Sequence, residues 1–171
     1  LGLLSLGATS AHAADDSLAV QAQAAWQRIT DIQAWQGDAH WRTIASPYTR
    51  HWRPSDEHRH VYALGMERQS ADHWLLGASY FRNSFGQPSA YTYLGRRSDG
   101  VLAEPRLFFQ WSLGVLYGYK GKYKSKVPLN LNGFAPGGVV SLGWQFDAQR
   151  SIVLHALGDA GVMLQLGYDW R

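Results

Sequence analysis

Residues 107–119 read LFFQWSLGVLYGY. Bulky apolar or aromatic side chains stand at every odd position of this stretch, whereas Gln110, Ser112, Gly114 and Gly118 stand at even positions. Successive side chains of a β-strand point to opposite faces, so the stretch predicts a strand with one bulky face and one face of small and amide side chains. A soluble barrel fills its centre with bulk, and the reverse pattern predicts a strand whose bulky face meets lipid.

The same two-residue period recurs along the chain, clearly so at 140–146 and 162–170. We predict strands at residues 45–53, 61–68, 73–83, 89–97, 106–119, 137–146, 151–158 and 161–170. The predicted fold class is all-β: an eight-stranded antiparallel transmembrane β-barrel with an N-terminal amphipathic α-helix. A soluble β-sandwich or lipocalin-like barrel is the alternative, but no charge stands in the centre of any predicted outward face.

The composition fits this class. The chain has 171 residues, of which 46% are hydrophobic, 17% charged and 13% aromatic. No apolar run reaches the ~18 residues that a membrane-spanning helix needs. The mean hydropathy of −0.28 is compatible with barrel strands, because their alternation averages out. The absence of cysteine excludes disulfides, thiol catalysis and Cys-based zinc sites. The net charge of +3 is too small to select among nucleic acid, phosphate and lipid headgroups as partners.

The N-terminus predicts export. Residues 1–13 (LGLLSLGATSAHA) resemble the apolar part and the A-x-A cleavage site of a signal peptide, although an apolar helix retained in the fold is the alternative. Residues 14–40 predict an amphipathic helix, and residues 41–171 the barrel, with helix and barrel forming one domain. We expect a Gram-negative outer-membrane protein, integral, monomeric, and with its longest loop, 120–136, on the external side.

A histidine and a serine come together at the external rim in this arrangement. His51 ends the first predicted strand, and Asn83 and Ser84 end the third. Strands one and three lie roughly 10 Å apart, within reach of side chains that lean together. The pair could act as base and nucleophile, or as a base that activates a bound hydroxyl, in acyl transfer.

The stretch SPYTRHWR at 46–53, followed by YFRNSF at 80–85, resembles the catalytic pattern of the lipid A palmitoyltransferase (PagP) family. The resemblance implies an outer-membrane barrel that moves an acyl chain from a phospholipid to lipid A without a cofactor. It carries the family's catalytic His and Ser onto His51 and Ser84. Asn83 stands where the family has Asp. The resemblance implies that this side chain orients His51 or polarises the ester carbonyl. The alternative function is a non-catalytic barrel that binds lipid or is a small transport or structural component.

Proline gives a second parallel with this family, in which prolines interrupt the barrel wall where acyl chains pass sideways. Pro47 resembles the first such place, and Pro128 and Pro136 resemble the second, since proline cannot donate to the strand ladder. Ordinary edge or loop prolines are the alternative.

Further residues are candidates for lipid contact. We predict that an acyl chain lies in the upper barrel against Phe81, Leu116, Val139, Leu157 and Met163, above a polar floor. In an extended segment the lysines Lys120, Lys122, Lys124 and Lys126 would share one face and could bind headgroup phosphates, although a charge run of this kind usually indicates only a solvated loop.

Other chemistry finds little support. Asp56, Glu57, His58 and His60 invite a metal site but lack a fixed third ligand, so we predict no metal. His155 is expected to be a hydrogen-bonded interior residue. The resemblance implies outer-membrane phospholipid and lipopolysaccharide as partners and no cofactor. The sequence itself gives no support for nucleic-acid binding.

Overall fold

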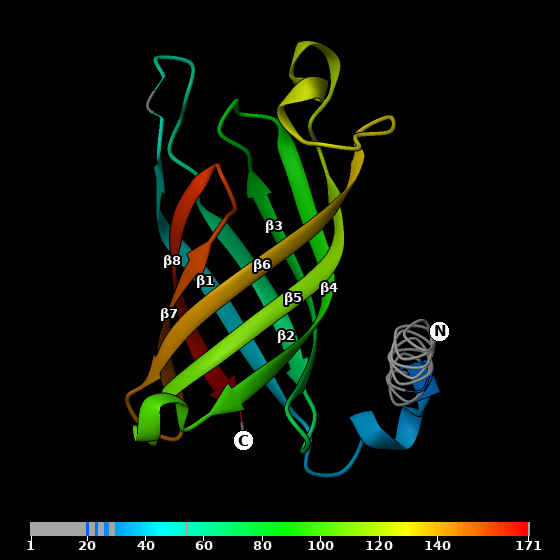
Figure 1. Cartoon of the computed structure of the whole chain (residues 1–171), viewed down its shortest axis with the longest axis vertical. Coiled ribbons are helices and arrows are strands. Elements are labelled where there is room, and N and C mark those ends of the chain that lie inside the picture. Colours follow the sequence, from blue (N-terminus) through cyan, green and yellow to red (C-terminus); the bar gives the residue numbers. More distant parts are fainter. Residues whose placement is uncertain (1–19, 21–22, 24–25, 28–29, 54, 171) are drawn as a thin grey trace, which may run out of the picture. The chain divides into compact units, whose positions relative to one another are not determined.

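The computed structural model describes residues 20, 23, 26–27, 30–53 and 55–170 (Figure 1). The chain divides into two units, residues 1–37 and 38–171. In the first unit the 3₁₀-helix η1 (Ile32–Trp35) follows Asp31, whose carboxylate accepts the backbone N–H of Gln33 at 3.0 Å. The predicted signal segment, 1–13, and residues 14–19, 21–22, 24–25 and 28–29 of the predicted helical region lie outside the described residues. No described helix is both long and apolar enough to cross a membrane.

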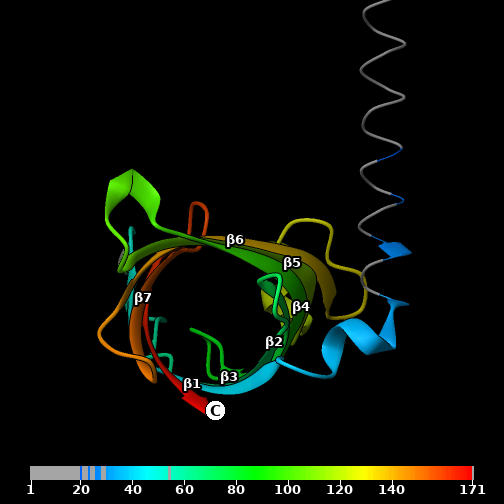
Figure 2. The same cartoon turned by 90° about the horizontal axis from the view of Figure 1, so that it is seen from below.

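The second unit is a closed antiparallel barrel, seen along its axis in Figure 2. Each strand pairs with the next along the chain, and β1 pairs with β8 to close the ring. This confirms the predicted eight-stranded antiparallel barrel. The strands are β1 (His40–His51), β2 (Ala63–Gln69), β3 (Trp74–Arg82), β4 (Pro88–Asp99), β5 (Leu107–Tyr117), β6 (Phe134–Gln145), β7 (Arg150–Ala156) and β8 (Gly161–Trp170), with 3₁₀-helices η2 (Val101–Ala103) and η3 (Gly121–Lys126) beside β5.

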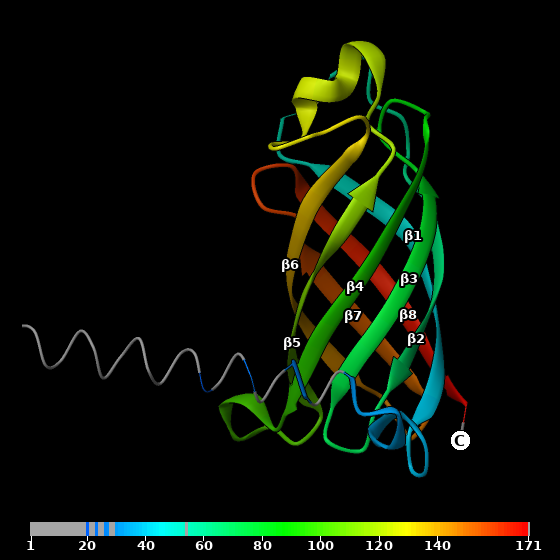
Figure 3. The ribbon, with the colours of Figure 1, turned by 90° about the vertical axis from the view of Figure 1, so that its right-hand side faces the viewer.

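The strands are inclined to the barrel axis, as closure of a sheet requires (Figure 3). The connections 52–62, 83–87, 118–133 and 157–160 lie at one end, which we call the loop rim, and the turns 70–73, 100–106 and 146–149 lie at the opposite, turn end. Residues 118–133 form the longest of these connections, and they contain η3.

The predicted start of the first strand is wrong by five residues. We expected the strand to begin at residue 45 and the helical region to extend to 40, but β1 begins at His40. Trp41 points outward, whereas Arg42 and Ile44 are buried in the barrel. Arg42 is a charged side chain at an inward position, so it hides the two-residue alternation that would have indicated a strand here. The other predicted strands end within three residues of the observed ones.

The bulky face of the strands is on the outside of the barrel, as predicted from β5. Leu113 on β5 is 62% exposed, whereas its inward neighbours Gln110 and Ser112 are buried. Further exposed apolar side chains follow around the wall on the other strands, among them Leu64, Leu76, Val140, Leu142, Leu154 and Leu166. We call this continuous surface the apolar belt.

The barrel interior at the turn end is filled, and it holds large apolar side chains as well as polar ones. Leu75 and Phe108 are fully buried. Phe108 lies over Gly143, where an added Cβ would come within 2.2 Å of the ring, and Tyr93 lies over Gly77 in the same way. Interior bulk on one strand is therefore accommodated by glycine on a neighbouring strand.

Charged groups inside the barrel are paired. The guanidinium of Arg42 donates to both carboxylate oxygens of Asp169, at 2.8 and 3.1 Å, and lies 3.5 Å from Glu67. The hydroxyl of Tyr93 donates to Glu67 at 2.6 Å. These partners offset the cost of burying the charges, and they join β1, β2, β4 and β8 across the interior.

Candidate functional site

His51 and Ser84 meet at the loop rim. His51 is the last residue of β1, and Ser84 lies in the turn after β3. The Nε2 atom of His51 is 2.6 Å from the Oγ atom of Ser84, which is a short hydrogen bond whose donor depends on the imidazole tautomer. Ser84 is buried and His51 is half-buried. The structure thus brings together the two residues whose pairing the sequence suggested.

Asn83 does not orient His51 through a described hydrogen bond, and its role in polarising the carbonyl stays a prediction. Its side-chain oxygen accepts the backbone N–H groups of Phe85 and Gln87, each at 3.0 Å, and the side chain is 1% exposed. None of its described hydrogen bonds goes to His51. Asn83 therefore fixes the turn that presents Ser84, and it is a positioning residue. An aspartate carboxylate could accept the same two N–H groups, so asparagine in place of aspartate leaves the turn intact.

The loop that follows β1 also packs on this pair, which the sequence analysis missed. The backbone N–H of Arg59 donates to the carbonyl oxygen of Ser84 at 2.8 Å. The ring of His58 lies 4.3 Å from the ring of His51, centroid to centroid, and makes an edge contact with Phe85 at 5.5 Å. The only sequence signal for His58 was its place in the candidate metal cluster.

The surroundings of His51 favour its neutral form. Arg50 and Arg82 point outward near the ends of β1 and β3, so the apolar belt ends below His51. Burial, followed by the nearby His58, lowers the pKa of the His51 imidazole below its ordinary value of 6.5. No ion pair among the described residues includes His51. A neutral imidazole with a free electron pair is the form that can accept a proton from a hydroxyl.

The side chains predicted to contact lipid lie in the half of the barrel nearer the loop rim, and all are partly exposed, namely Phe81, Leu116, Val139, Leu157 and Met163. We call the part of the interior that they border the well. Their role in lipid contact stays a prediction. The interior at the turn end differs, because Leu75 and Phe108 are fully buried there.

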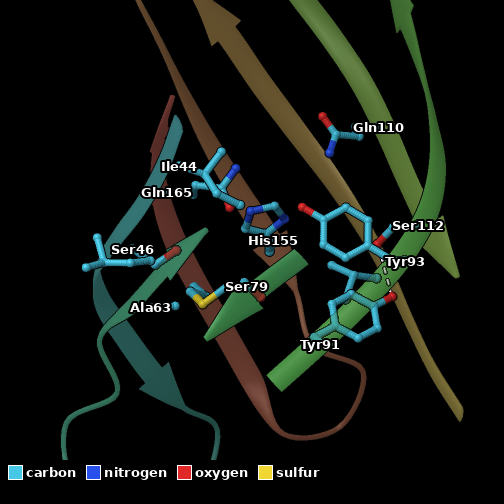
Figure 4. A pocket seen from close by; sticks show the side chains of 13 residues that line it. Ile44, Ser46, Ala63, Ser79, Tyr91, Tyr93, Gln110, Ser112, His155 and Gln165 are labelled. Atoms are coloured by element: carbon cyan, nitrogen blue, oxygen red, sulfur yellow. Dashed lines mark hydrogen bonds between the residues drawn. The ribbon is translucent and has the colours of Figure 1, made fainter. Parts of the chain in front are cut away.

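Polar and apolar side chains line a cavity inside the barrel (Figure 4). Its volume is about 40 Å³, and Tyr91, Ser112, Val139, His155 and Met163 are among the residues that line it. The Tyr91 hydroxyl donates to the carbonyl oxygen of Gly137 at 3.2 Å. A cavity of this size holds about three water molecules, so it cannot hold an acyl chain.

The barrel wall is incompletely paired at two places beside the well. The β1–β2 ladder ends at the pair of Ser46 and Ala63, and the β1–β8 ladder skips Pro47 at a bulge. The β6–β7 ladder ends at Val140, so residues 134–139, which include Pro136, pair only with β5. Pro47 and Pro136 thus stand where the ladder is incompletely paired, and their role in lateral access stays a prediction.

Pro128 is not part of this wall. It lies in the connection between β5 and β6, outside any strand. The expectation that it interrupts the ladder is wrong, because β6 begins only at Phe134.

The four lysines do not share one face. Residues 121–126 form the 3₁₀-helix η3 instead of an extended segment, so side chains two residues apart point in different directions. Lys120 contacts the Tyr117 hydroxyl, and Lys122 lies 3.7 Å from Glu57. The ammonium of Lys126 lies 5.8 Å above the ring of Phe85. The role of these lysines in headgroup binding stays a prediction. It now concerns separate positions around the loop rim instead of one shared face.

The remaining histidines are accounted for in part. His155 is buried and its Nδ1 atom is 2.7 Å from the hydroxyl oxygen of Ser141, which confirms a hydrogen-bonded interior residue. Within the described part of the chain, no group of three potential metal ligands gathers, at Asp56, Glu57, His58 and His60 or elsewhere.

Comparisons with known proteins add one distant likeness. No protein-family model and no curated protein matches the chain. Among solved structures the barrel is similar to Ail, the attachment invasion locus protein of Yersinia pestis, in complex with the heparin analogue sucrose octasulfate. The two chains are 13% identical with a TM-score of 0.39, and the alignment covers 77% of this chain and 97% of Ail. A likeness at this level carries no argument about function, which must rest on the residues of this chain.

Proposed function

We propose that the chain is an integral outer-membrane barrel that transfers an acyl chain from a phospholipid to lipid A or a related acceptor. The apolar belt supports the membrane placement, because a water-soluble monomer seldom exposes a continuous apolar surface of this extent. Aromatic side chains border the belt towards both ends, with Trp41 and Trp170 at the turn end and Tyr62 and Tyr80 at the loop rim. Such borders are typical of membrane barrels.

The observation that carries the proposed activity is the 2.6 Å contact between His51 and Ser84 at the loop rim. Acyl transfer through an ester needs at least a base beside a hydroxyl, and this pair supplies both. In this proposal the donor's acyl chain lies against the apolar side chains that border the well, and it enters from the membrane at the two incompletely paired places in the wall. No cofactor is needed for this reaction.

The proton path follows from the pair. His51 accepts the Ser84 hydroxyl proton as Oγ attacks the donor's ester carbonyl. The tetrahedral intermediate then breaks its bond to the lysophospholipid oxygen, and this oxygen takes the proton from His51. An acceptor hydroxyl next attacks the acyl-serine, His51 accepts its proton, and the proton returns to Ser84 as the ester bond to Oγ breaks. The products are lysophospholipid and the acylated acceptor.

The test is mass spectrometry of lipid A and phospholipid from Gram-negative membranes with and without the protein. We expect one added acyl chain on the acceptor and a matching rise in lysophospholipid. His51→Ala and Ser84→Ala should abolish both changes. His60→Ala is the matched control, because His60 lies in the same loop and its only described ring contact is with Tyr62. Acylation that persists in His51→Ala, or its absence from the unaltered protein, would refute the mechanism.

A non-catalytic lipid-binding barrel is the second candidate. It is favoured by the absence of any described carboxylate paired with His51, which leaves an imidazolium without compensation. This candidate predicts that the purified barrel retains phospholipid equally well in its unaltered form and as the His51→Ala variant, and that no acyl chain moves. A channel for solutes is disfavoured because Leu75 and Phe108 fill the barrel at the turn end.

A further inference from the structure

The connection between β5 and β6 carries an exposed apolar tip that the proposed reaction does not use. Residues 127–132, which we call the outer flap, expose Leu129 to 77% and Leu131 to 78%. Figure 2 shows this connection reaching outside the ring of strands. Two exposed leucines within three residues of an external loop would be unfavourable in water.

The flap is braced in this conformation. The side-chain amide of Asn130 donates to the carbonyl oxygen of Tyr119 at 2.7 Å and accepts the backbone N–H of Gly133 at 2.9 Å. Leu131 and Phe134 exchange two backbone hydrogen bonds, at 2.7 and 2.9 Å. Leu129 has a φ of +55°, in a region that favours glycine. The leucines are thus held outward by the backbone around them.

The apolar tip is continuous with the apolar belt. Leu131 is joined through its backbone to Phe134, the first residue of β6, which is 54% exposed on the outer wall. The ring of Phe134 lies 4.7 Å from that of Tyr117 on β5. The exposed apolar surface along β5 and β6 therefore reaches the flap at Phe134, which Leu131 contacts through its backbone.

Basic groups lie beside the same tip. A groove at the flap is lined by Lys124 and Ser125 together with Val127, Pro128, Leu129 and Leu131. Lys124 has no ion-pair partner among the described residues. Apolar side chains next to lysine form the combination that binds an anionic lipid interface, with hydrocarbon under the leucines and phosphate beside the ammonium.

We propose that the outer flap inserts into the outer leaflet, with Leu129 and Leu131 among acyl chains and Lys124 beside lipid phosphate. This inference rests on the membrane placement in the proposed function but not on acyl transfer. The flap stands beside the residues 134–139 of β6 that lack a partner on β7, so it would hold a lipid at that opening in the wall.

The absence of cysteine from the chain allows a direct test, because a single introduced cysteine can carry a fluorescent label. The full chain is reconstituted into phosphatidylcholine vesicles with phosphatidylglycerol, labelled with NBD at Leu129→Cys or Leu131→Cys. Leu113→Cys on the belt is the membrane control, and Asp56→Cys in the exposed β1–β2 loop is the aqueous control. Quenching by nitroxide on lipid chains is compared with quenching by aqueous iodide.

We expect both flap labels to be quenched by lipid nitroxide, as Leu113→Cys is, and to resist iodide. Lys124→Glu should shift the Leu129→Cys label towards iodide. Flap labels that behave like Asp56→Cys overturn the inference while Leu113→Cys still reports a membrane barrel. Shielding from both quenchers that grows with protein density identifies a second copy as the occupant, and also overturns it. Failure of lipid quenching at Leu113→Cys refutes the membrane placement itself.

Discussion

Replacing Asn83 by alanine removes the acceptor that holds the turn carrying Ser84. Two backbone N–H groups, those of Phe85 and Gln87, lose hydrogen bonds of 3.0 Å in a partly buried site. At about 1 kcal/mol each, the loss destabilises the turn by about 2 kcal/mol. If only the intact turn aligns Ser84 with His51, this corresponds to a fall in acyl transfer of about 30-fold.

Asn83→Asp is the discriminating companion variant. Its carboxylate keeps both acceptor contacts and gives up only the 3.5 Å contact between the Asn83 amide and Gln87. We expect near-normal transfer and no gain, because Asn83 does not touch His51. Both variants are assayed for lipid A acylation in membranes and for urea unfolding in detergent. Unchanged transfer in Asn83→Ala would refute the role of the turn, and an equal loss in Asn83→Asp would show that the amide nitrogen, rather than the oxygen, matters.

Three further predictions follow from the site and the interior. Transfer should fall on acidification with a midpoint below pH 6.5, because the base is neutral His51 and its pKa is lowered; a pH–rate profile with a midpoint above 6.5 contradicts this. Gly143→Ala should destabilise the barrel by about 1–3 kcal/mol in urea unfolding, because its Cβ would lie 2.2 Å from the Phe108 ring; Gly138→Ala on the same strand, whose Cβ would come no closer than 3.2 Å to the flexible end of Leu113, tests for a general effect of the added methyl. Asp169→Ala should cost about 3–5 kcal/mol, since it deprives buried Arg42 of both hydrogen bonds; a loss under 1 kcal/mol would show that Glu67 alone suffices.

The barrel could be predicted because its outward face is set by a local rule. Alternation along β5 predicts from the sequence alone that Leu113 points outward and Gln110 inward, since the two-residue period can be recognised without knowing the neighbouring strands. The interior needs that knowledge. Phe108 fits inside only because Gly143 lies opposite it in the β5–β6 register, a pairing fixed by closure of the whole sheet.

The site was predictable to the extent that it lies on strand ends. His51 ends a strand, Ser84 follows another by two residues, and the order of strands in a barrel brings the two together. Lys122 and His58 lie on long connections between strands. The course of such connections depends on packing, so the two-residue alternation of the strands does not predict it. The alternating lysines predicted an extended segment, but the chain turns into η3 after Gly121, which has a φ of +58°.

The filled interior at the turn end limits how the site can be supplied. Beneath the well, Arg42 and Asp169 link β1 to β8, and Leu75 and Phe108 leave no passage along the axis. A donor chain that occupies the well must therefore come either over the loop rim or through the wall. Passage over the rim would carry hydrocarbon through water, at about 0.8 kcal/mol for each exposed CH₂. Under the proposed function, passage through the places where β1 and β6 lack partners would keep the chain in the membrane throughout, so the proposal favours this lateral route over the rim.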